Sequence, residues 1–328
     1  MKNTLNIYRI MRVLVTGGAG FIGSHICDEL IKQDHYVLVI DNLSTGSIKN
    51  IEHLQGHKNF MLIVADITDK DCCYNIMDNY DLDAVCHQAA LGSVPRSIAT
   101  PDITHDSNVI GFFNILNNAR ILGIKRFVYA SSSSVYGSDT NSPKLESIMG
   151  QPLSPYAVSK YIDEVYAQVF TRCYNMTTIG LRYFNIFGPR QSPKGPYAAV
   201  IPKFINHCNN NEQAQIYGDG SYSRDFTYVK NAVYANIMAL TTTNEQAFGQ
   251  AYNIGSEENT SINSLYSIIA QECNKSHISP IYKEPRQGDV PHSMASIEKA
   301  QKYIGYKVIV PFRQGIKETV NQSNTSQS

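Results

Sequence analysis

The sequence predicts an α/β fold, in which a doubly wound parallel sheet is followed by a smaller α/β lobe. Short apolar runs rich in β-branched residues alternate with longer helical patterns through the first half of the chain. Such runs are typical of parallel strands that are buried on both faces. The rhythm breaks near residue 185, where Gly188-Pro189, Ser192-Pro193 and Gly195-Pro196 mark loops. We therefore expect the second half to form a separate, smaller lobe.

The expected strands and helices alternate, as parallel strands joined by helical crossovers require. Strands are expected at Arg12–Thr16, Tyr36–Asp41, Phe60–Ala65, Ala84–Gln88, Phe127–Ala130 and Thr178–Arg182. Helices are expected at Phe21–Gln33, Asn108–Leu122 and Tyr156–Tyr174.

Composition and charge exclude several classes of protein. Twenty-eight basic residues balance 28 acidic ones, which argues against a nucleic-acid partner, because such proteins neutralise phosphates. No stretch approaches the ~18 apolar residues of a membrane span, and residues 1–10 lack the apolar run of a secretory signal. The seven cysteines form no Cys-x-x-Cys motif. We therefore expect reduced thiols, no metal site and a cytoplasmic protein.

A glycine-rich loop follows the first expected strand. The segment Gly17-Gly-Ala-Gly-Phe-Ile-Gly23 leads directly from this strand into a helix. Glycines let the backbone turn tightly and approach a pyrophosphate, whose charge the helix N-terminus favours. Asp41 ends the next strand, 18 residues after Gly23. A carboxylate there accepts hydrogen bonds from ribose hydroxyls and repels a 2′-phosphate, so the pattern predicts NAD rather than NADP.

A tyrosine and a lysine lie one helical turn apart near the middle of the chain. Tyr156 and Lys160 are four residues apart and therefore share one face of a helix. A neighbouring ammonium group and an oxidised nicotinamide both favour a phenolate, which can then act as a general base near neutral pH. The run Ser131–Ser134 follows a strand at the sheet edge where ligands bind. A hydroxyl there can hydrogen-bond the substrate oxygen as its proton moves.

Several motifs together resemble the extended short-chain dehydrogenase/reductases, over residues 11–318. They are the glycine loop at 16–23, Asp41-Asn42, Asp66-Ile67, Gln88-Ala-Ala90, the serine run, and Tyr156 with Lys160. The segments Leu181–Arg190 and Arg286–Asp289 narrow the resemblance to nucleotide-sugar enzymes. Among these the chain is most similar to the UDP-hexose 4-epimerases, in particular the UDP-N-acetylglucosamine 4-epimerases of bacterial polysaccharide (O-antigen) biosynthesis.

The resemblance implies a Rossmann-like NAD-binding domain at 11–184, with a return segment at about 222–258. It also implies a smaller substrate-binding lobe at 185–221 and 259–318, and loose termini at 1–10 and 319–328. The residues that it implies for binding NAD are Gly17, Gly20, Phe21, Ile22, Gly23, Asp41, Asn42, Ser44, Thr45, Gly46, Asp66, Ile67, Gln88, Ala89, Ala90, Tyr156, Lys160 and Tyr183.

The implied reaction is epimerisation at C4 of a UDP-sugar through a transient 4-keto sugar, with NAD kept bound. The catalytic residues implied are Tyr156, Lys160 and Ser132. Because the serine run is one residue longer than usual, Ser133 could share or take the role of Ser132. The other residues implied to contact the substrate are Gly92, Ser93, Arg96, Asn185, Gln191, Ala199, Val200, Tyr217, Arg224, Arg286, Asp289 and Ser293.

Two positions help to choose among the relatives. The 4,6-dehydratases carry Thr-Asp-Glu where this chain has Ser132-Ser133-Ser134, and serines cannot supply the extra acid and base of elimination. Epimerases limited to glucose and galactose carry a bulky aromatic where this chain has Ser293, so the pocket is expected to accept a 2-acetamido group. The sequence leaves open whether UDP-glucose and UDP-galactose are also turned over. The alternative functions are a UDP-uronate 4-epimerase, a nucleotide-sugar 4-keto reductase and, more remotely, a catalytically silent NAD-binding module.

The resemblance also implies a homodimer. Relatives pair through a bundle of four helices, two from each subunit, and the matching helices here are Asn108–Leu122 and Tyr156–Tyr174. The expected partners are thus a second copy and a UDP-sugar, with no nucleic acid and no membrane.

Overall fold

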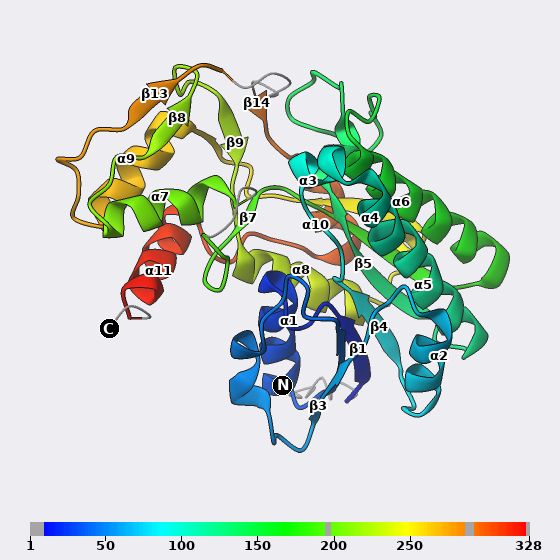
Figure 1. The fold of residues 1–328 in the computed structure, drawn as a ribbon. Coiled ribbons are helices and arrows are strands. Elements are labelled where there is room, and N and C mark those ends of the chain that lie inside the picture. Colours follow the sequence, from blue (N-terminus) through cyan, green and yellow to red (C-terminus); the bar gives the residue numbers. More distant parts are fainter. Residues whose placement is uncertain (1–9, 194–197, 286–291, 326–328) are drawn as a thin grey trace, which may run out of the picture.

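The computed structural model describes residues 10–193, 198–285 and 292–325 (Figure 1). Figure 1 shows two parts: a large sheet covered by helices, and a smaller lobe that contains α7, α9 and the strands β8, β9 and β13. The large part holds the first half of the chain together with α8, α10 and β11.

The centre of the large part is a seven-stranded parallel sheet with the strand order β11-β6-β5-β4-β1-β2-β3. Its strands are β1 (Arg12–Thr16), β2 (Tyr36–Asp41), β3 (Phe60–Val64), β4 (Ala84–His87), β5 (Arg126–Ser132), β6 (Thr177–Tyr183) and β11 (Gln250–Ile254). The six expected strands are confirmed, with ends that differ by at most two residues. The seventh, β11, joins the sheet from the second half of the chain. The order reverses at β1, which pairs with β2 on one side and β4 on the other.

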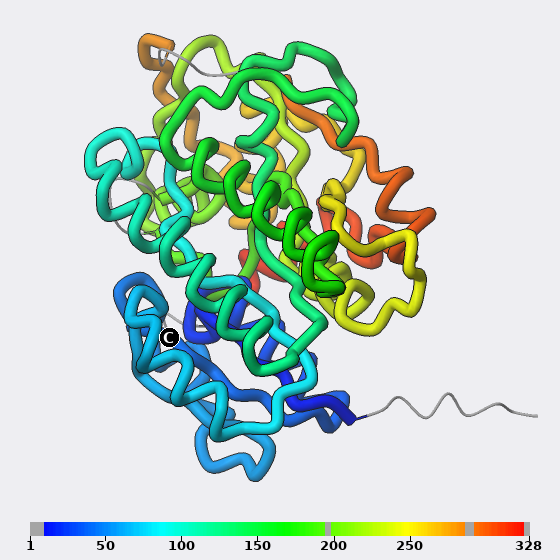
Figure 2. The backbone as a smooth tube through the Cα atoms, turned by 90° about the vertical axis from the view of Figure 1, so that its right-hand side faces the viewer, coloured from blue at the N-terminus to red at the C-terminus, as the bar shows by residue number. Residues whose placement is uncertain are grey.

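Helices cover both faces of this sheet. They are α1 (Phe21–Lys32) and α8 (Val229–Thr241) on one face, and α2 (Lys70–Asp78), α5 (Gly111–Ile121) and α6 (Pro155–Tyr174) on the other. Alternate residues of β1 serve the two faces: Val13 and Val15 pack in the core with α1 and α8, whereas Leu14 packs in the core with α5. Figure 2 looks onto the second face, where α5 and α6 run side by side. The doubly wound arrangement is thereby confirmed.

The expected helices are present, with one difference. The helix expected at Asn108–Leu122 is α5, and a π-helical turn at Asp106–Ile110 joins α5 to α4 (Pro101–His105). The expected helices do not include α2, α3 (Val94–Ala99) or α4, which have nine, six and five residues and are short for a helical period to be recognised.

The smaller lobe contains short strands and several helices. Its elements are α7 (Val200–Asn209), β8 (Gln215–Tyr217), β9 (Ser223–Asp225), β12 (Asn259–Ser261), α9 (Ile262–Glu272), β13 (Ile281–Lys283), β14 (His292–Ser293) and α11 (Phe312–Thr325). Strand β9 pairs with β12 and β14, and β8 pairs with β13. Other short elements are β7 (Ile186–Phe187), β10 (Thr227–Tyr228), α10 (Glu298–Ile304) and single 3-10 turns at Ile48–Asn50, Glu52–Leu54, Ser133–Tyr136 and Glu245–Ala247.

The expectation of a loose C-terminus at 319–328 is wrong for the residues up to Thr325. These residues continue helix α11. Phe312, Ile316 and Val320 recur every four residues and are all buried in the core, so one face of the helix is anchored by apolar contacts. The polar residues Asn321, Gln322 and Asn324 of the same helix are exposed.

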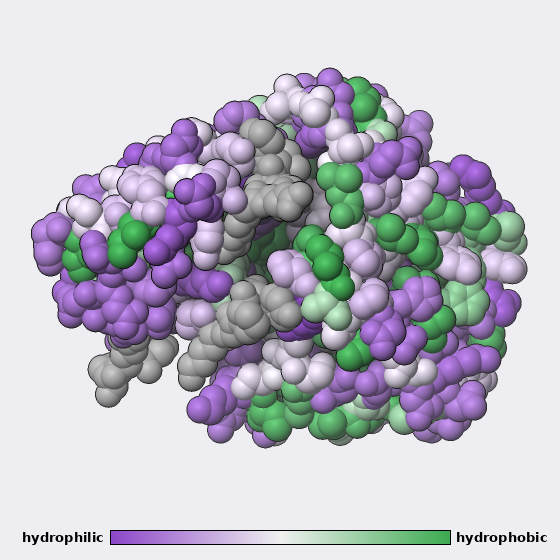
Figure 3. Space-filling model, turned by 45° about the horizontal axis from the view of Figure 1, so that its top comes forward, coloured by the Kyte–Doolittle hydropathy of each residue, from purple (hydrophilic) through white to green (hydrophobic). Residues whose placement is uncertain are grey.

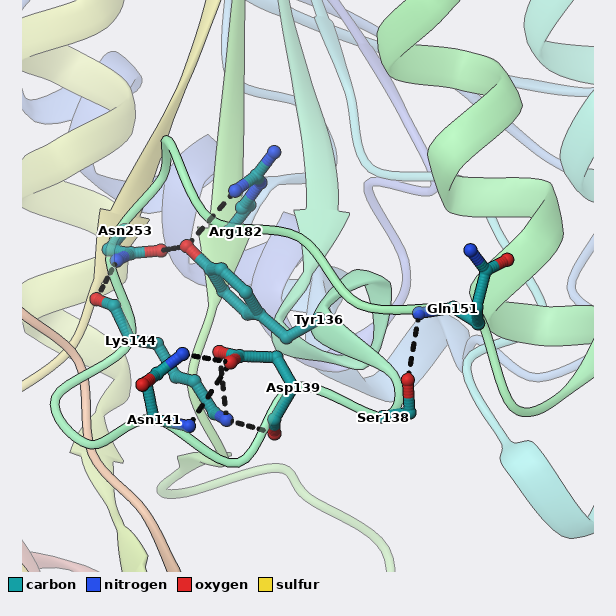
Figure 4. Close-up of polar contacts among 8 residues, drawn as sticks. All are labelled: Tyr136, Ser138, Asp139, Asn141, Lys144, Gln151, Arg182 and Asn253. Carbon is teal, nitrogen blue, oxygen red and sulfur yellow. Dashed lines mark hydrogen bonds and ion pairs between the residues drawn. The ribbon is translucent and has the colours of Figure 1, made fainter.

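A buried polar network holds the loop that follows β5 (Figure 4). The side chain of Asn253, on β11, accepts a hydrogen bond from the Tyr136 hydroxyl at 2.6 Å. It also donates to the backbone carbonyls of Lys144 at 2.9 Å and Ser296 at 3.0 Å. Arg182 donates to the same Tyr136 hydroxyl at 3.0 Å. One amide therefore joins the sheet edge, the loop and the segment that follows β14.

The tip of this loop is fixed by an ion pair. Lys144 and Asp139 form a buried pair at 3.1 Å, and Lys144 also donates to the Asp139 carbonyl (Figure 4). The backbone N–H of Lys144 donates to the carbonyl of Met294 at 2.7 Å, and Ser296 donates back to Lys144 at 3.0 Å. The loop and the segment after Ser293 thus hold one another in place.

We expect Asn253→Leu to lower the stability of the fold. Leucine keeps the volume but leaves the carbonyls of Lys144 and Ser296 without this donor and Tyr136 without one acceptor. Each buried polar group that loses its partner costs about 1–3 kcal/mol, so the free energy of unfolding should fall by about 2–5 kcal/mol. Chemical denaturation measures this change. Asn259→Leu, at an exposed position of β12, is the control, and an equal loss in both variants would contradict the role of the network.

Candidate active site

A cavity of about 510 Å³ opens at the carboxyl ends of the central strands. It lies where the strand order reverses at β1, the place where open α/β sheets bind ligands, and its volume suits a small-molecule site. Figure 3 shows the hollow between the two parts of the molecule. All residues predicted to bind NAD line this cavity except Gly46 and Asp66. Those two support it from outside: Gly46 packs against Ala19, and Asp66 accepts a hydrogen bond from Asn42 at 2.8 Å.

The glycine loop forms a cradle that side chains would fill. Gly17 has a φ of +69°, and a Cβ atom there would lie 2.7 Å from the backbone nitrogen of Ala89. A Cβ atom at Gly23 would overlap the carbonyl oxygen of Gly17. Gly20 precedes the first turn of α1 and has no side chain to cap it. The first N–H groups of α1 are therefore free to bind an anion, as a dinucleotide pyrophosphate requires.

Asp41 lies beside this cradle at the end of β2. Its carboxylate is almost buried and accepts hydrogen bonds from the backbone N–H groups of Ala19 at 2.9 Å and Leu43 at 2.8 Å. Each oxygen keeps a lone pair for a ribose hydroxyl. A 2′-phosphate would meet this negative charge, so the cradle fits NAD better than NADP.

A triangle of side chains closes the floor of the cavity. The Tyr183 hydroxyl donates to Gln88 Oε1 at 3.0 Å, Gln88 donates to Asn236 at 3.1 Å, and Asn236 donates to the Tyr183 oxygen at 2.6 Å. Burial raises the pKa of Tyr183, so this tyrosine stays protonated. Asn236 lies on α8, far along the chain, and no sequence motif pointed to it.

The four serines of the run differ in what they contact. Ser131 donates to Glu164 at 2.5 Å and is therefore engaged. Ser132 and Ser134 bond to each other, since the Ser132 hydroxyl donates to Ser134 Oγ at 3.1 Å and accepts from the Ser134 N–H. Ser133 lines the cavity, and the structure gives its side chain no hydrogen bond with another described residue. Both candidates for the catalytic hydroxyl therefore lie at the cavity wall.

Tyr156 and Lys160 reach the cavity from the first turns of α6. Ser154 caps this helix by accepting a hydrogen bond from the N–H of Ala157 at 3.1 Å, and Pro155 follows as its first residue. Tyr156 and Lys160 both line the cavity. The ammonium group of Lys160 donates to Asp163 at 3.1 Å. Among the described contacts, no hydrogen bond joins Lys160 to the tyrosine hydroxyl.

His87 lies under the site and is uncharged. Its Nδ1 is 2.9 Å from the Thr16 hydroxyl, and its Nε2 is buried without a hydrogen-bond partner in the described part of the chain. Burial and, to a lesser extent, the charge of Lys160 lower the pKa of His87 to about 3. A neutral imidazole therefore adds no positive charge beside the lysine.

The residues predicted to bind the substrate divide into two groups. Those that line the cavity are Gly92, Ser132, Ser133, Tyr156, Asn185 and Gln191. Gln191 donates to the carbonyl of Ile186 at 3.1 Å, while its Oε1 is buried without a partner in the described residues. That oxygen is able to accept a hydrogen bond from a ligand. Asn185 has a φ of +37° and donates to the carbonyl of Asp225 at 2.8 Å, which ties the cavity to β9.

The structure does not bring the other predicted substrate residues to the cavity wall. They are Ser93, Arg96, Ala199, Val200, Tyr217, Arg224 and Ser293. Ser93 instead caps α3 by accepting from the N–H of Arg96 at 3.2 Å, and Tyr217 is 39% exposed on β8. Arg224 and Ser293 face each other in register on β9 and β14. Arg286 and Asp289 lie outside the described residues.

Within residues 10–193, 198–285 and 292–325, no group of three histidine, cysteine or acidic side chains could hold a metal ion. In these segments no helix has both the length and the apolarity for crossing a bilayer. The cysteines are unpaired thiols, and of them Cys173 is exposed.

The chain is similar to known proteins over nearly its whole length. It is 42% identical over 311 residues to a putative UDP-glucose 4-epimerase of Methanocaldococcus jannaschii, covering 94% of this chain and 97% of that one. The solved UDP-N-acetylglucosamine 4-epimerase of Methanobrevibacter ruminantium, in complex with UDP-N-acetylmuramic acid, is 40% identical with a TM-score of 0.90. That comparison covers 97% of this chain and 99% of the other.

A second solved structure, the UDP-glucose 4-epimerase of Thermotoga maritima with UDP-glucose, has a TM-score of 0.91 and 34% identity. It covers 97% of this chain and 100% of that one. The model of the NAD dependent epimerase/dehydratase family matches residues 13–255. The resemblance to the extended short-chain dehydrogenase/reductases and the expectation of NAD are thus confirmed. With its glycine cradle, Asp41 and the Tyr156–Lys160 pair around one cavity, the chain belongs to the NAD-dependent epimerase/dehydratase family.

Proposed function

We propose that this protein is a UDP-sugar 4-epimerase that interconverts UDP-N-acetylglucosamine and UDP-N-acetylgalactosamine. One observation carries the proposal: Tyr156 and the serine run line the same cavity as the dinucleotide cradle. The similar proteins named above support the class of reaction, and one of them is named for UDP-N-acetylglucosamine. UDP-glucose and UDP-galactose are further candidate substrates.

The residues of the cavity suit a reversible oxidation at C4 of the sugar. Tyr156 takes the proton of the 4-hydroxyl group as its O–H bond breaks, and later returns the proton to the 4-keto oxygen. NAD, held by the glycine loop and Asp41, would supply a reversible acceptor for the hydride of C4, so that the hydride could return to the other face of the rotated sugar. Lys160 contributes positive charge that favours the phenolate. Since no net oxidation occurs, the chain needs no second substrate.

A serine hydroxyl donates a hydrogen bond to the same sugar oxygen in this proposal. Ser132 must release Ser134 to do so, because its hydroxyl proton lies between the two serine oxygens at 3.1 Å. Ser133 has no such bond in the described residues and lines the same wall. Either hydroxyl would stabilise the oxygen as its negative charge develops.

The choice of an acetamido substrate rests on Ser293, a position where epimerases limited to glucose and galactose carry a bulky aromatic residue, although Ser293 does not line the cavity in this structure. Ser293 stands beside Arg224 on the short parallel pair of β14 and β9. A serine there leaves room that an aromatic ring would fill, and a steric block of this kind discriminates between substrates. The free oxygen of Gln191 offers an acceptor for an N–H or O–H group of the ligand.

We also propose that two copies associate through α5 and α6. Apolar side chains are exposed along these helices, and Figure 3 shows hydrophobic residues gathered on that side of the molecule. They include Val158, Tyr161, Val165, Tyr166 and Val169, each 39–44% exposed on α6. An uncovered apolar face of this kind is typical of an interface, and the two helices lie side by side as half of a four-helix bundle requires.

The protein as purified, with no cofactor added, should convert UDP-N-acetylglucosamine into UDP-N-acetylgalactosamine. Nuclear magnetic resonance of the products measures this, and denaturation should release about one NAD per chain, as expected for one dinucleotide-binding domain. Tyr156→Phe removes the base and should lower kcat by about 10²–10⁴-fold while NAD stays bound.

Three other results would each point elsewhere. Turnover that starts only when NADH is supplied would favour the 4-keto reductase. A strong preference for a UDP-uronate would favour a uronate 4-epimerase. Bound NAD without reaction on any UDP-sugar would favour a silent NAD-binding module.

Ser293→Tyr should close the space for the acetamido group. We expect kcat/KM for UDP-N-acetylglucosamine to fall at least about tenfold, with a much smaller change for UDP-glucose. Steady-state kinetics on both substrates measures the split. The control is Ser276→Tyr, at an exposed serine of the same lobe; equal losses on both substrates in Ser293→Tyr would rule out this gate.

Light scattering should give twice the mass of one chain. Val165→Asp places a charge on the exposed face of α6 and should yield monomers, because an unpaired buried charge is costly at an interface. Ile309→Asp is the matched control, since Ile309 is 44% exposed and lies just before α11. A parent protein that runs as a monomer would refute the dimer.

A further inference from the structure

Lys160 shares its buried surroundings with a carboxylate that no motif singled out. The Nζ atom of Lys160 lies 3.1 Å from Oδ2 of Asp163, which follows it by three residues on α6. Both side chains are enclosed, with 2% of Lys160 and none of Asp163 exposed. The other carboxylate oxygen, Oδ1 of Asp163, is buried without a hydrogen-bond partner among the described residues.

Asp163 occupies a position that the pattern of α6 gives to apolar residues. Ala167 and Phe170 follow it at helical spacing on the face that packs against the sheet. A buried ion pair is weak evidence for stability, because apolar residues of similar volume often stabilise a fold as well or better. An unsatisfied oxygen weakens the case further. The carboxylate therefore calls for an explanation other than the stability of the fold.

We propose that Asp163 is a positioning residue for the reaction: it fixes the ammonium group of Lys160 and sets how much of its charge acts on Tyr156. This inference rests on the proposed function. When the carboxylate is ionised, the pair is neutral overall and its field at the tyrosine is weak. When the carboxyl group is protonated, the full positive charge of Lys160 favours the phenolate.

The surroundings of the pair allow this change near neutral pH. Burial raises the pKa of Asp163 to about 7, and the charge of Lys160 opposes that rise only in part. The charged and titratable groups around the pair are Glu164 on α6, His87 on β4, Tyr129 on β5 and Arg182 on β6.

Three of these surrounding groups keep a constant charge near neutral pH. His87 is neutral, burial raises the pKa of Tyr129, and Arg182, which pairs with Glu164 at 2.8 Å, stays protonated. We therefore assign a pH-dependent change in charge beside Lys160 to Asp163.

Two substitutions separate charge from shape. Asp163→Asn keeps the size and one oxygen acceptor for Lys160 but removes the negative charge. We expect the acidic limb of its kcat/KM profile to move to lower pH by about one unit. Asp163→Ala removes the acceptor as well, and its kcat should fall by about tenfold or more at every pH, because the ammonium group is no longer held in place. Asp71→Asn, at an exposed position of α2, changes the net charge equally and should keep the parent profile.

Thermal unfolding gives a second readout that needs no substrate. When folding raises the pKa of a carboxyl group, the fold loses stability as the pH rises from the pKa of the unfolded state to that of the folded state. Here these values are about 4 and about 7. Asp163→Asn removes this dependence. The difference in Tm between Asp163→Asn and the parent should therefore grow by a few degrees as the pH rises from roughly 5 to 8. The difference between Asp71→Asn and the parent should stay constant over this range.

The outcomes are distinguishable. The proposal is supported if, in Asp163→Asn, the acidic limb of the kcat/KM profile moves to lower pH and the difference in Tm from the parent grows with pH. Parent-like profiles in both Asp163 variants, or equal losses at every pH in both, would overturn it and leave Asp163 a purely structural role. If no UDP-sugar is turned over but the relative Tm changes as expected, the proposed function fails while the titrating carboxyl group stands.

Discussion

The reversal of strand order at β1 decides where every group of the site lies. Thr16, the last residue of β1, is in register with Ile40 of β2 on one side and His87 of β4 on the other. The backbone of Gly17 then bonds to Ile40 at 2.8 Å, and that of Gln88 bonds to Thr16 at 3.0 Å. The loops after β1 and β4 leave the sheet on opposite sides, and the crevice between them is the cavity. The glycine cradle and helix α6, which carries Tyr156 and Lys160, line the same cavity because of this pairing.

The smaller lobe is joined to that crevice by a second buried group, Asp225. Its carboxylate accepts hydrogen bonds from the N–H groups of Ser256 at 2.8 Å, Glu257 at 3.1 Å and Ala295 at 3.2 Å. Its carbonyl oxygen accepts from Asn185 at the cavity wall. Asp225 thus joins three other segments, which contain Asn185, Ser256–Glu257 and Ala295, and the polar network around Asn253 holds the same region from the other side. The position of the smaller lobe relative to the glycine cradle depends on both.

Local patterns were enough to predict most of the large sheet and the centre of the site. Strands buried on both faces show as apolar runs, and the glycine loop and the Tyr156–Lys160 pair are short motifs whose spacing is fixed by one helix or one turn. Strand β11 and the triangle around Asn236 depend on contacts between distant parts of the chain, which no local pattern contains. Asp163 is different, since an acid at an apolar position of a helix three residues after Lys160 was visible in the sequence. Only the structure shows that it is enclosed.

Helix α6 performs several tasks at once, and this restricts how the protein can evolve. Its first turn presents Tyr156 to the cavity, its inner face carries Lys160 and Asp163, and Glu164 binds Arg182 of the sheet. Its outer face is apolar and exposed. Few positions of this helix are left to vary without consequence. A substitution on any face of this helix would therefore alter the cavity, the contact with the sheet or the outer surface.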